Sequence, residues 1–152
     1  MNRQAVRLII VNDVGQILLG KSARSGSIKF LGGGIEEGET AVDAAVRELA
    51  EEAKIKLAPE SLQLLGEVTE IISEDNPNLV EGLREGETQQ ASYFLAHSNA
   101  NFTAGDEIAG LVWIDKDKVL DTLTYPTQKE AYAQLFLGQE ESLSLKQWTK
   151  KV

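Results

Sequence analysis

Residues 40–53 constrain the fold more than any other stretch, because they predict one capped amphipathic helix. Thr40 followed three residues later by Asp43 is a capping-box pattern, and residues 41–53 are mostly good helix formers. At about 100° per residue, the apolar side chains of this helix, Leu49 among them, gather on one side. The sequence therefore predicts a helix that packs this side against a core.

The other side of the predicted helix is acidic. Glu48, Glu51 and Glu52 lie within about 100° of one another around the helix axis. Because like charges at helical spacing repel, the pattern indicates either a solvated acidic surface or a bound cation. The preceding segment favours the cation, since it brings glycines at 32–34 and further glutamates within residues 36–39.

Oxygen ligands, mainly carboxylates, suit hard cations such as Mg²⁺ or Mn²⁺, and Mg²⁺ also accepts phosphate oxygens of a substrate. The glycines at 32–34 predict a tight turn in which a backbone carbonyl can approach such an ion, because no side chain obstructs it. An ordinary turn with no ligand role is the alternative for these glycines.

The rest of the chain predicts an α/β domain spanning residues 1–152. Its apolar runs predict a hairpin and three later strands, at residues 5–11, 16–20, 62–72, 89–96 and 111–114. Thr127 with Glu130 predicts the cap of a second helix that runs to about residue 136, with a third helical turn near 142–148. Residues 73–87 form a long acidic loop between strands. This alternation favours helices packed on a mixed sheet.

Charge and composition exclude several classes of protein. The formal net charge of −9 argues against a partner that is nucleic acid or anionic membrane, because both are themselves negative. The chain has no cysteine, which excludes disulfides and thiolate chemistry. Its first apolar run is too short for a signal peptide or a membrane span, so we expect a cytoplasmic protein. The sequence leaves a homodimer open.

The segment GGIEEGETAVDAAVRELAEEAKI, residues 33–55, resembles the Nudix box, G-x5-E-x7-R-E-U-x-E-E-x-G-U with U aliphatic. Eight specified positions fall in register: Gly33, Glu39, Arg47, Glu48, Leu49, Glu51, Glu52 and Ile55. On these residues the chain is identified as a member of the Nudix hydrolase superfamily. The resemblance implies an α/β/α sandwich around a mixed sheet, with the box forming a loop-helix-loop metal site.

The resemblance also implies a reaction and a role for each matched residue. The expected reaction is hydrolysis of a nucleoside triphosphate or another nucleoside diphosphate derivative, with Mg²⁺ or Mn²⁺ and an attacking water. Glu48, Glu51 and Glu52 look like the metal-binding carboxylates, with the Gly33 carbonyl as a further ligand. Arg47 and Glu39 look like an ion pair that orients the site.

Two positions depart from the family pattern. Lys54 stands where the box has glycine, and Leu31 stands where many members have proline before the two glycines. A glycine that ends a helix often adopts the left-handed conformation, which costs a residue with a Cβ about 1 kcal/mol or more. These departures motivate the alternative of a catalytically weak or inactive Nudix-like module that binds a nucleotide or nucleotide sugar.

The general base has several candidates outside the box. Glu107 precedes a predicted strand, where an acid in this family can bind metal or act as the base, although a surface acid is the alternative. Three acids of the long loop, Glu81, Glu85 and Glu87, compete for the same role. The base has to lie within hydrogen-bond or one-water reach of the nucleophile.

Substrate-binding candidates precede the box. Lys21 and Arg24 could meet phosphates, although solubility is the plainer explanation for each. Phe30 could stack on a nucleobase, but an aromatic residue beside a strand more often belongs to the core.

Overall fold

The computed structural model describes residues 3–71, 88–100, 102–105 and 108–138. The strands are β1 (Arg3–Val11), β2 (Gln16–Ser22), β3 (Ile28–Lys29), β4 (Leu31–Gly34), β5 (Gln63–Ile71), β6 (Thr88–His97) and β7 (Ile108–Asp115). The helices are α1 (Ala41–Ala53), α2 (Val119–Thr122) and α3 (Pro126–Ala131), which continues as a π-helical stretch, η3 (Tyr132–Leu137). Single 3₁₀ turns occupy η1 (Pro59–Ser61) and η2 (Lys116–Lys118).

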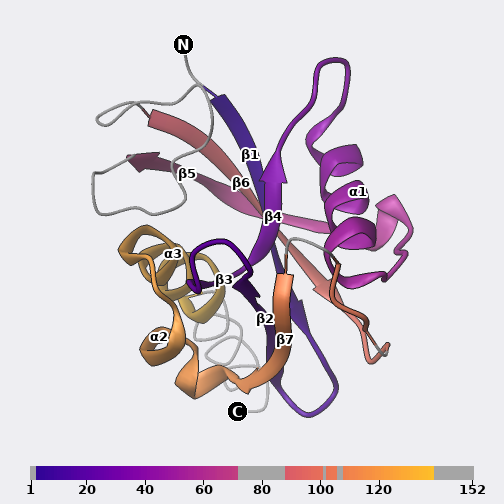
Figure 1. Cartoon of the computed structure of the whole chain (residues 1–152). Coiled ribbons are helices and arrows are strands. Elements are labelled where there is room, and N and C mark those ends of the chain that lie inside the picture. The colour runs from indigo at the N-terminus through magenta and orange to yellow at the C-terminus, as the bar shows by residue number, and fades with distance from the viewer. Residues whose placement is uncertain (1–2, 72–87, 101, 106–107, 139–152) are drawn as a thin grey trace, which may run out of the picture.

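Strand β1 is the centre of a mixed sheet. It pairs in parallel with β6 and antiparallel with β4, while β5 extends the sheet beyond β6. Its pairing with β2 lies at the hairpin, where Val11 is opposite Ile17. Strand β2 then pairs with β3 and β7, so the sheet opens into two groups of strands that splay apart (Figure 1).

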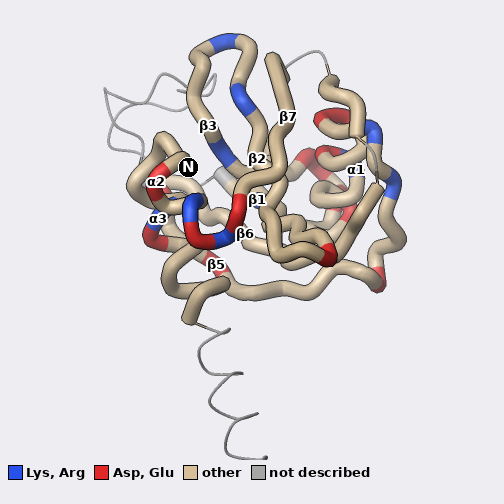
Figure 2. The backbone as a smooth tube through the Cα atoms, turned by 90° about the horizontal axis from the view of Figure 1, so that it is seen from below, with Lys and Arg blue, Asp and Glu red and all other residues tan. Residues whose placement is uncertain are grey.

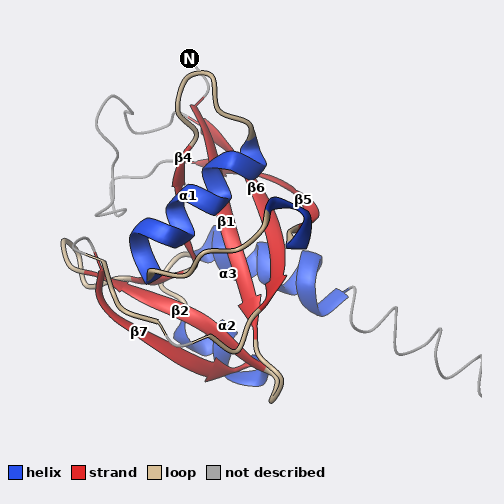
Figure 3. Ribbon diagram, turned by 90° about the vertical axis from the view of Figure 1, so that its right-hand side faces the viewer, coloured by secondary structure: helices blue, strands red, loops and turns tan. Residues whose placement is uncertain are grey.

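Helices cover both faces of the sheet and complete an α/β/α sandwich. Helix α1 lies on one face, and α2 and α3 lie on the other (Figures 1 and 3). Alternate residues of β1 point to opposite faces, so Val6 and Leu8 pack with the α1 side while Ile9 packs with the α3 side. This architecture confirms the predicted α/β/α sandwich around a mixed sheet.

The predicted capping box starts helix α1. The Thr40 hydroxyl accepts a hydrogen bond from the Asp43 N–H at 3.1 Å, and the Asp43 carboxylate accepts one from the Thr40 N–H at 3.3 Å. Both bonds satisfy N–H groups that have no partner within the helix. Ala44, Leu49 and Ala53 are buried on the sheet side, which confirms the predicted apolar face.

Lys54 ends the helix in the conformation that the family pattern reserves for glycine. Its φ and ψ angles are 56° and 31°, in the left-handed region, and its N–H donates to the Ala50 carbonyl at 3.2 Å. The helix therefore ends at Ala53 and does not run on through residue 55. Lys54 therefore adopts the left-handed conformation despite the steric cost of its Cβ.

The three glycines at 32–34 belong to a strand, so the predicted tight turn is wrong. Strand β4 pairs with β1, with Gly32 opposite Arg7 and Gly33 opposite Val6. Gly32 has a φ of 149°, and a Cβ there would overlap the Val6 carbonyl. Glycine at this position therefore lets β4 lie against β1.

The second predicted helix starts earlier and differently from the expectation. Helix α3 begins at Pro126, with Tyr125 as its N-cap and no side-chain cap, so the predicted Thr127–Glu130 cap is wrong. Proline at the first helical turn supplies the start signal instead. The short helix α2 was not predicted, and the third helical turn at 142–148 and the loop at 73–87 lie outside the described residues.

No helix in the described part of the chain has the length and apolar character needed to cross a membrane.

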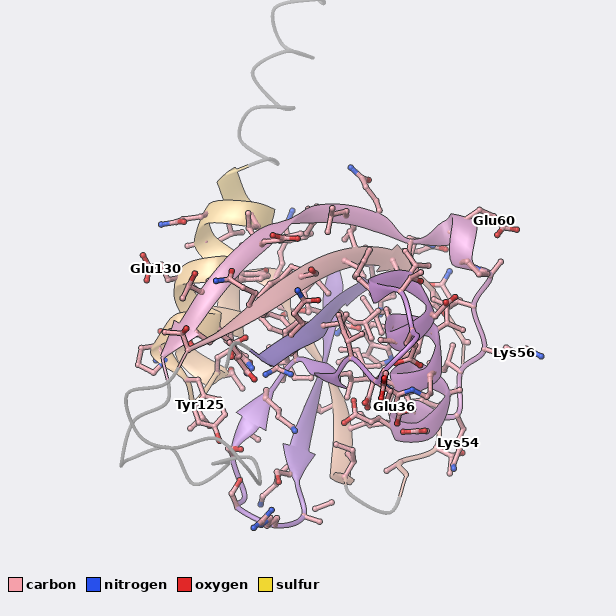
Figure 4. All side chains as sticks on the ribbon, turned by 90° about the horizontal axis from the view of Figure 1, so that it is seen from above. Glu36, Lys54, Lys56, Glu60, Tyr125 and Glu130 are labelled. Atoms are coloured by element: carbon pink, nitrogen blue, oxygen red, sulfur yellow. The ribbon has the colours of Figure 1, made fainter. Side chains whose placement is uncertain are left out.

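We expect Lys54→Gly to stabilise the protein by about 1 kcal/mol, because glycine adopts the left-handed conformation without a Cβ penalty. Urea denaturation with metal removed measures the change. Lys56→Gly is the matched control, since Lys56 is also exposed and has no positive φ (Figure 4). Equal effects of the two substitutions would contradict a local strain at Lys54.

Candidate active site on helix α1

Arg47 ties helix α1 to the segment that precedes it. Its Nε lies 2.7 Å from Glu39 Oε2, and its Nη2 lies 3.0 Å from Glu39 Oε1, which makes a bidentate ion pair. Nη2 also donates to the Gly34 carbonyl at 3.0 Å. Bidentate arginine–carboxylate pairs fix geometry as well as charge. The predicted pair of Arg47 and Glu39 is therefore present and joins the helix to β4.

This pair keeps both partners charged. The hydrogen bond from Arg47 lowers the pKa of Glu39 to about 2, assisted by the Glu36 N–H, which donates to Glu39 Oε1 at 3.0 Å. The same contact with Glu39 raises the pKa of Arg47 above its usual value. The frame of the site therefore does not titrate near neutral pH.

Arg47 also gathers the other acids of the segment. Its Nη1 lies 3.0 Å from Glu48 Oε1, 3.4 Å from Glu51 Oε2 and 3.7 Å from Glu36 Oε1. The Glu48 side chain is 12% exposed and the Glu51 side chain 59% exposed. One guanidinium thus offsets part of the repulsion among these carboxylates.

Glu52 points toward the sheet. It is 5% exposed, and its Oε1 accepts a hydrogen bond from the Gly32 N–H at 2.7 Å. Burial raises the pKa of Glu52 to about 7, although the Gly32 N–H and the charges of Lys29 and Arg7 act in the opposite direction. Glu52 is a buried carboxyl with too little positive charge around it to stay fully ionised at neutral pH.

Gly33 makes room for the Glu48 carboxylate. A Cβ at Gly33 would overlap Glu48 Oε1, so the missing side chain forms the seat of this carboxylate. Gly33 and the Glu48 carboxylate are therefore in contact, while Glu52 is held by the Gly32 N–H and Glu51 contacts Arg47.

The donor set fits a hard divalent cation by its chemistry, because it offers carboxylate oxygens and a backbone carbonyl. Two observations support this fit: the space beside Gly33 that holds the Glu48 carboxylate, and the buried Glu52 carboxyl, which has too little positive charge around it. In the described residues, however, no three acids or histidines converge into a ready ligand cluster. Glu48 and Glu51 face Arg47, and Glu52 is held by Gly32.

The predicted phosphate-binding residues lie on a separate hairpin. Lys21, near the end of β2, and Arg24, in the β2–β3 connection, are both exposed, and Figure 2 shows basic positions on this hairpin away from the acids of α1. Lys29, on β3, is the basic residue of this hairpin whose charge acts on Glu52. Lys29 is therefore the residue of this hairpin that lies close enough to Glu52 to affect its pKa.

Phe30 lies in the core, as the alternative to nucleobase stacking predicted. It is fully buried, with ring centroids 6.0 Å from Tyr93 and 5.9 Å from Tyr132. Its N–H donates to Gln128 Oε1 at 3.1 Å. The ring is enclosed by side chains and presents no face for a nucleobase.

The candidate bases Glu107, Glu81, Glu85 and Glu87 lie outside the described residues. Sequence reasoning missed a set of buried polar residues on β1, β5 and β6, which includes Arg7 and Glu70. The available signal was Arg7 inside the otherwise apolar run at residues 5–11.

A family model described as the NUDIX domain matches residues 1–135 of the chain. An RNA pyrophosphohydrolase of Dinoroseobacter shibae is 28% identical over 145 residues, which cover 88% of this chain and 89% of that protein. An RNA pyrophosphohydrolase of a Psychrobacter species is 46% identical over 63 residues, which cover 41% of this chain. The match spans only 35% of the length of that second relative.

Solved structures share the fold. The chain is similar to the dihydroneopterin triphosphate pyrophosphohydrolase of E. coli, with a TM-score of 0.73 and 21% sequence identity. The similarity covers 89% of this chain and 95% of that one. At this identity the likeness establishes the architecture alone.

The raised pKa of Glu52, about 7, predicts that the metal-free protein loses stability as the pH rises. Above about pH 4.3 an unfolded glutamate releases its proton, whereas folded Glu52 retains it up to about pH 7. Because the folded state then binds more protons, the free energy of unfolding falls across this window.

Glu52→Gln removes the charge and keeps an oxygen for the Gly32 N–H. We therefore expect the variant to be more stable than wild type at pH 8, by on the order of 1–3 kcal/mol, with a smaller gain at pH 5. Urea denaturation in EDTA at both pH values measures this difference. Glu51→Gln, at an exposed position, is the control and should show no such gain. A gain for Glu52→Gln that does not grow with pH would contradict the buried-charge explanation.

Proposed function

This chain belongs to the NUDIX domain family of the Nudix hydrolase superfamily, and we propose that it is a divalent-metal-dependent pyrophosphohydrolase. Its proposed substrate is a nucleoside triphosphate or another nucleoside diphosphate derivative. The observation that carries the proposal is the seat of the Glu48 carboxylate against Gly33, with Arg47 and Glu39 locking the helix beside it.

In this proposal Glu48, Glu51, Glu52 and the Gly33 carbonyl hold Mg²⁺ or Mn²⁺. The bound ion supplies Lewis-acid activation of the pyrophosphate and lowers the pKa of the attacking water. Arg47 and Glu39 keep α1 and β4 in register, so that the ligands from both elements stay together. Arg47 also contacts Glu48 and Glu51, so it would keep two of the ligands next to each other where the ion would bind.

Lys21 and Arg24 are the proposed contacts for the outer phosphates, since both are exposed cations on the hairpin that carries Lys29 toward Glu52. Glu107 remains a proposed general base or further metal ligand. An acidic protein of net charge −9 would meet an anionic substrate through these cations and the metal.

A second candidate substrate is the pyrophosphate-bearing end of an RNA. Two relatives carry the name RNA pyrophosphohydrolase, which supports this candidate. The net charge of −9 favours a small nucleotide, because a long phosphate backbone would be repelled. RNA is therefore part of the substrate test. The inactive binding module, motivated by Lys54 and Leu31, is the remaining alternative.

We expect the purified protein with Mg²⁺ or Mn²⁺ to release phosphate or pyrophosphate from at least one member of a substrate panel. The panel contains nucleoside triphosphates, nucleoside diphosphate sugars, dinucleoside polyphosphates and a 5′-triphosphorylated RNA, and mass spectrometry identifies the products. Glu51→Gln should lower kcat/KM by about 100-fold or more, because a metal contributes several kcal/mol of charge stabilisation.

Glu60→Gln is the matched control, since it removes one exposed carboxylate just beyond α1 and should keep wild-type activity (Figure 4). Calorimetric titration with Mn²⁺ should also show weaker binding for Glu51→Gln than for wild type. Nucleotide binding without turnover would favour the binding module. No turnover, together with equal metal affinity of the two proteins, would overturn the proposal.

A further inference from the structure

Four polar side chains form a cluster within the sheet, on the face opposite α1. They come from three neighbouring strands: Arg7 from β1, Glu70 from β5, and Gln89 and Tyr93 from β6. Arg7 is directly opposite Tyr93, and Glu70 is directly opposite Gln89. Side chains of these paired positions share a face of the sheet. We call this set the β1–β5–β6 polar cluster.

Hydrogen bonds join the cluster through one oxygen. Arg7 Nη2 lies 3.3 Å from Glu70 Oε2, and Gln89 Nε2 donates to the same oxygen at 3.2 Å. Glu70 is 7% exposed, Gln89 3% and Tyr93 fully buried. Tyr93 is opposite Arg7 on the neighbouring strand, and the charges of Arg7 and Glu70 both affect the pKa of its hydroxyl.

Each member retains a buried atom without a hydrogen-bond partner among the described residues. These atoms are Arg7 Nε, Glu70 Oε1, Gln89 Oε1 and Tyr93 OH. Buried polar groups in folded proteins are nearly always paired, and an unpaired one costs free energy. Four such atoms in one cluster therefore indicate a partner that belongs there, either a polar ligand or ordered water.

The cluster adjoins the candidate active site. Arg7 is opposite Gly32 in the β1–β4 pairing, and the Gly32 N–H donates to Glu52 on α1. The charge of Arg7 also acts on Glu52. One bound molecule could therefore place its phosphates near α1 and another polar group at the cluster.

The free atoms define the chemistry of that group. Glu70 Oε1 and Gln89 Oε1 accept hydrogen bonds, while Arg7 Nε donates one. This pattern complements a ring edge with two adjacent N–H donors beside a carbonyl. Guanine and pterins share such an edge, the 2-amino-4-oxopyrimidine fragment. Adenine presents a ring nitrogen lone pair at the corresponding position, which a carboxylate would repel.

We propose that the β1–β5–β6 polar cluster binds the 2-amino-4-oxopyrimidine edge of the substrate's ring, with the Glu70 carboxylate accepting its N–H donors. This inference rests on the pyrophosphohydrolase function proposed above and names the class of base. Tyr93, whose pKa is raised by burial, keeps its hydroxyl proton and can donate or accept at the edge of the ring.

The test compares kcat/KM for GTP, ITP, ATP and neopterin triphosphate. ITP lacks only the 2-amino group of GTP, so the GTP-to-ITP ratio isolates the contact made by Glu70. We expect GTP or neopterin triphosphate to exceed ATP by about 10-fold or more, and GTP to exceed ITP, because hydrogen bonds to a base edge discriminate on this scale. The better of GTP and neopterin triphosphate identifies which molecule supplies the shared edge.

Glu70→Gln should abolish this preference, because the amide turns an N–H toward the N–H donors of the base. Glu67→Gln is the matched control on the same strand; Glu67 is exposed and pairs with Ser92 outside the cluster, so its variant should keep the preference. Thermal melts establish that each variant is folded. If Glu70→Gln does not fold, Gln89→Met replaces it, and it too should reduce the preference.

Equal kcat/KM values for GTP, ITP and ATP in wild type would overturn the inference, as would a preference that survives Glu70→Gln. The cluster would then hold ordered water only. If no nucleotide is hydrolysed, the proposed function fails separately, and saturation-transfer NMR with guanosine, neopterin and adenosine tests the cluster directly. Selective binding of guanosine or neopterin would then support the site, and no selectivity would overturn it.

Discussion

The hydrogen bond from the Gly32 N–H to the buried Glu52 carboxyl is the interaction on which the candidate site depends. It joins the end of α1 to β4, and β4 is in turn paired with β1 at the centre of the sheet. Arg47 makes a second connection through the Gly34 carbonyl. Two connections one turn or more apart fix both the position and the rotation of the helix. These two contacts therefore hold α1 against β4, with Glu52 buried between them and Glu51 left exposed.

The acids of this site carry an electrostatic cost that the connections offset only in part. Burial raises the pKa of Glu52. Glu48 and Glu51 both form ion pairs with the single guanidinium of Arg47. Replacing such carboxyls with neutral residues would relieve the repulsion. A buried carboxyl with a raised pKa, such as Glu52, is characteristic of functional sites, where burial and neighbouring charges tune titratable groups. The buried Glu52 carboxyl and the neighbouring acids thus lower the stability of the metal-free protein and at the same time support the proposed activity.

Features set by residues close in sequence could be predicted, whereas features set by pairing between distant segments could not. Helix α1 and its Thr40 cap follow from spacing within one segment, and the structure confirms them. The predicted acidic side is only partly correct, because Glu52 is buried toward the sheet. The strand character of Gly32 could not be read locally, because glycine has little β propensity and its pairing with β1 is set by the fold. Phe30 is ambiguous for a similar reason, since its neighbours Tyr93 and Tyr132 are far along the chain.

The same reasoning separates the two proposed halves of the site. The proposed metal ligands are close in sequence, whereas the proposed base contacts join Arg7 to Glu70 across the sheet. Strand β1 links them, because alternation places Val6 against the α1 core and Arg7 on the other face. A one-residue shift in the register of β1 would exchange these two side chains between faces. A side chain at Gly32 would overlap the Val6 carbonyl and disturb the pairing of β4 with β1. The glycine therefore helps to keep both the acidic site and the β1–β5–β6 polar cluster in place.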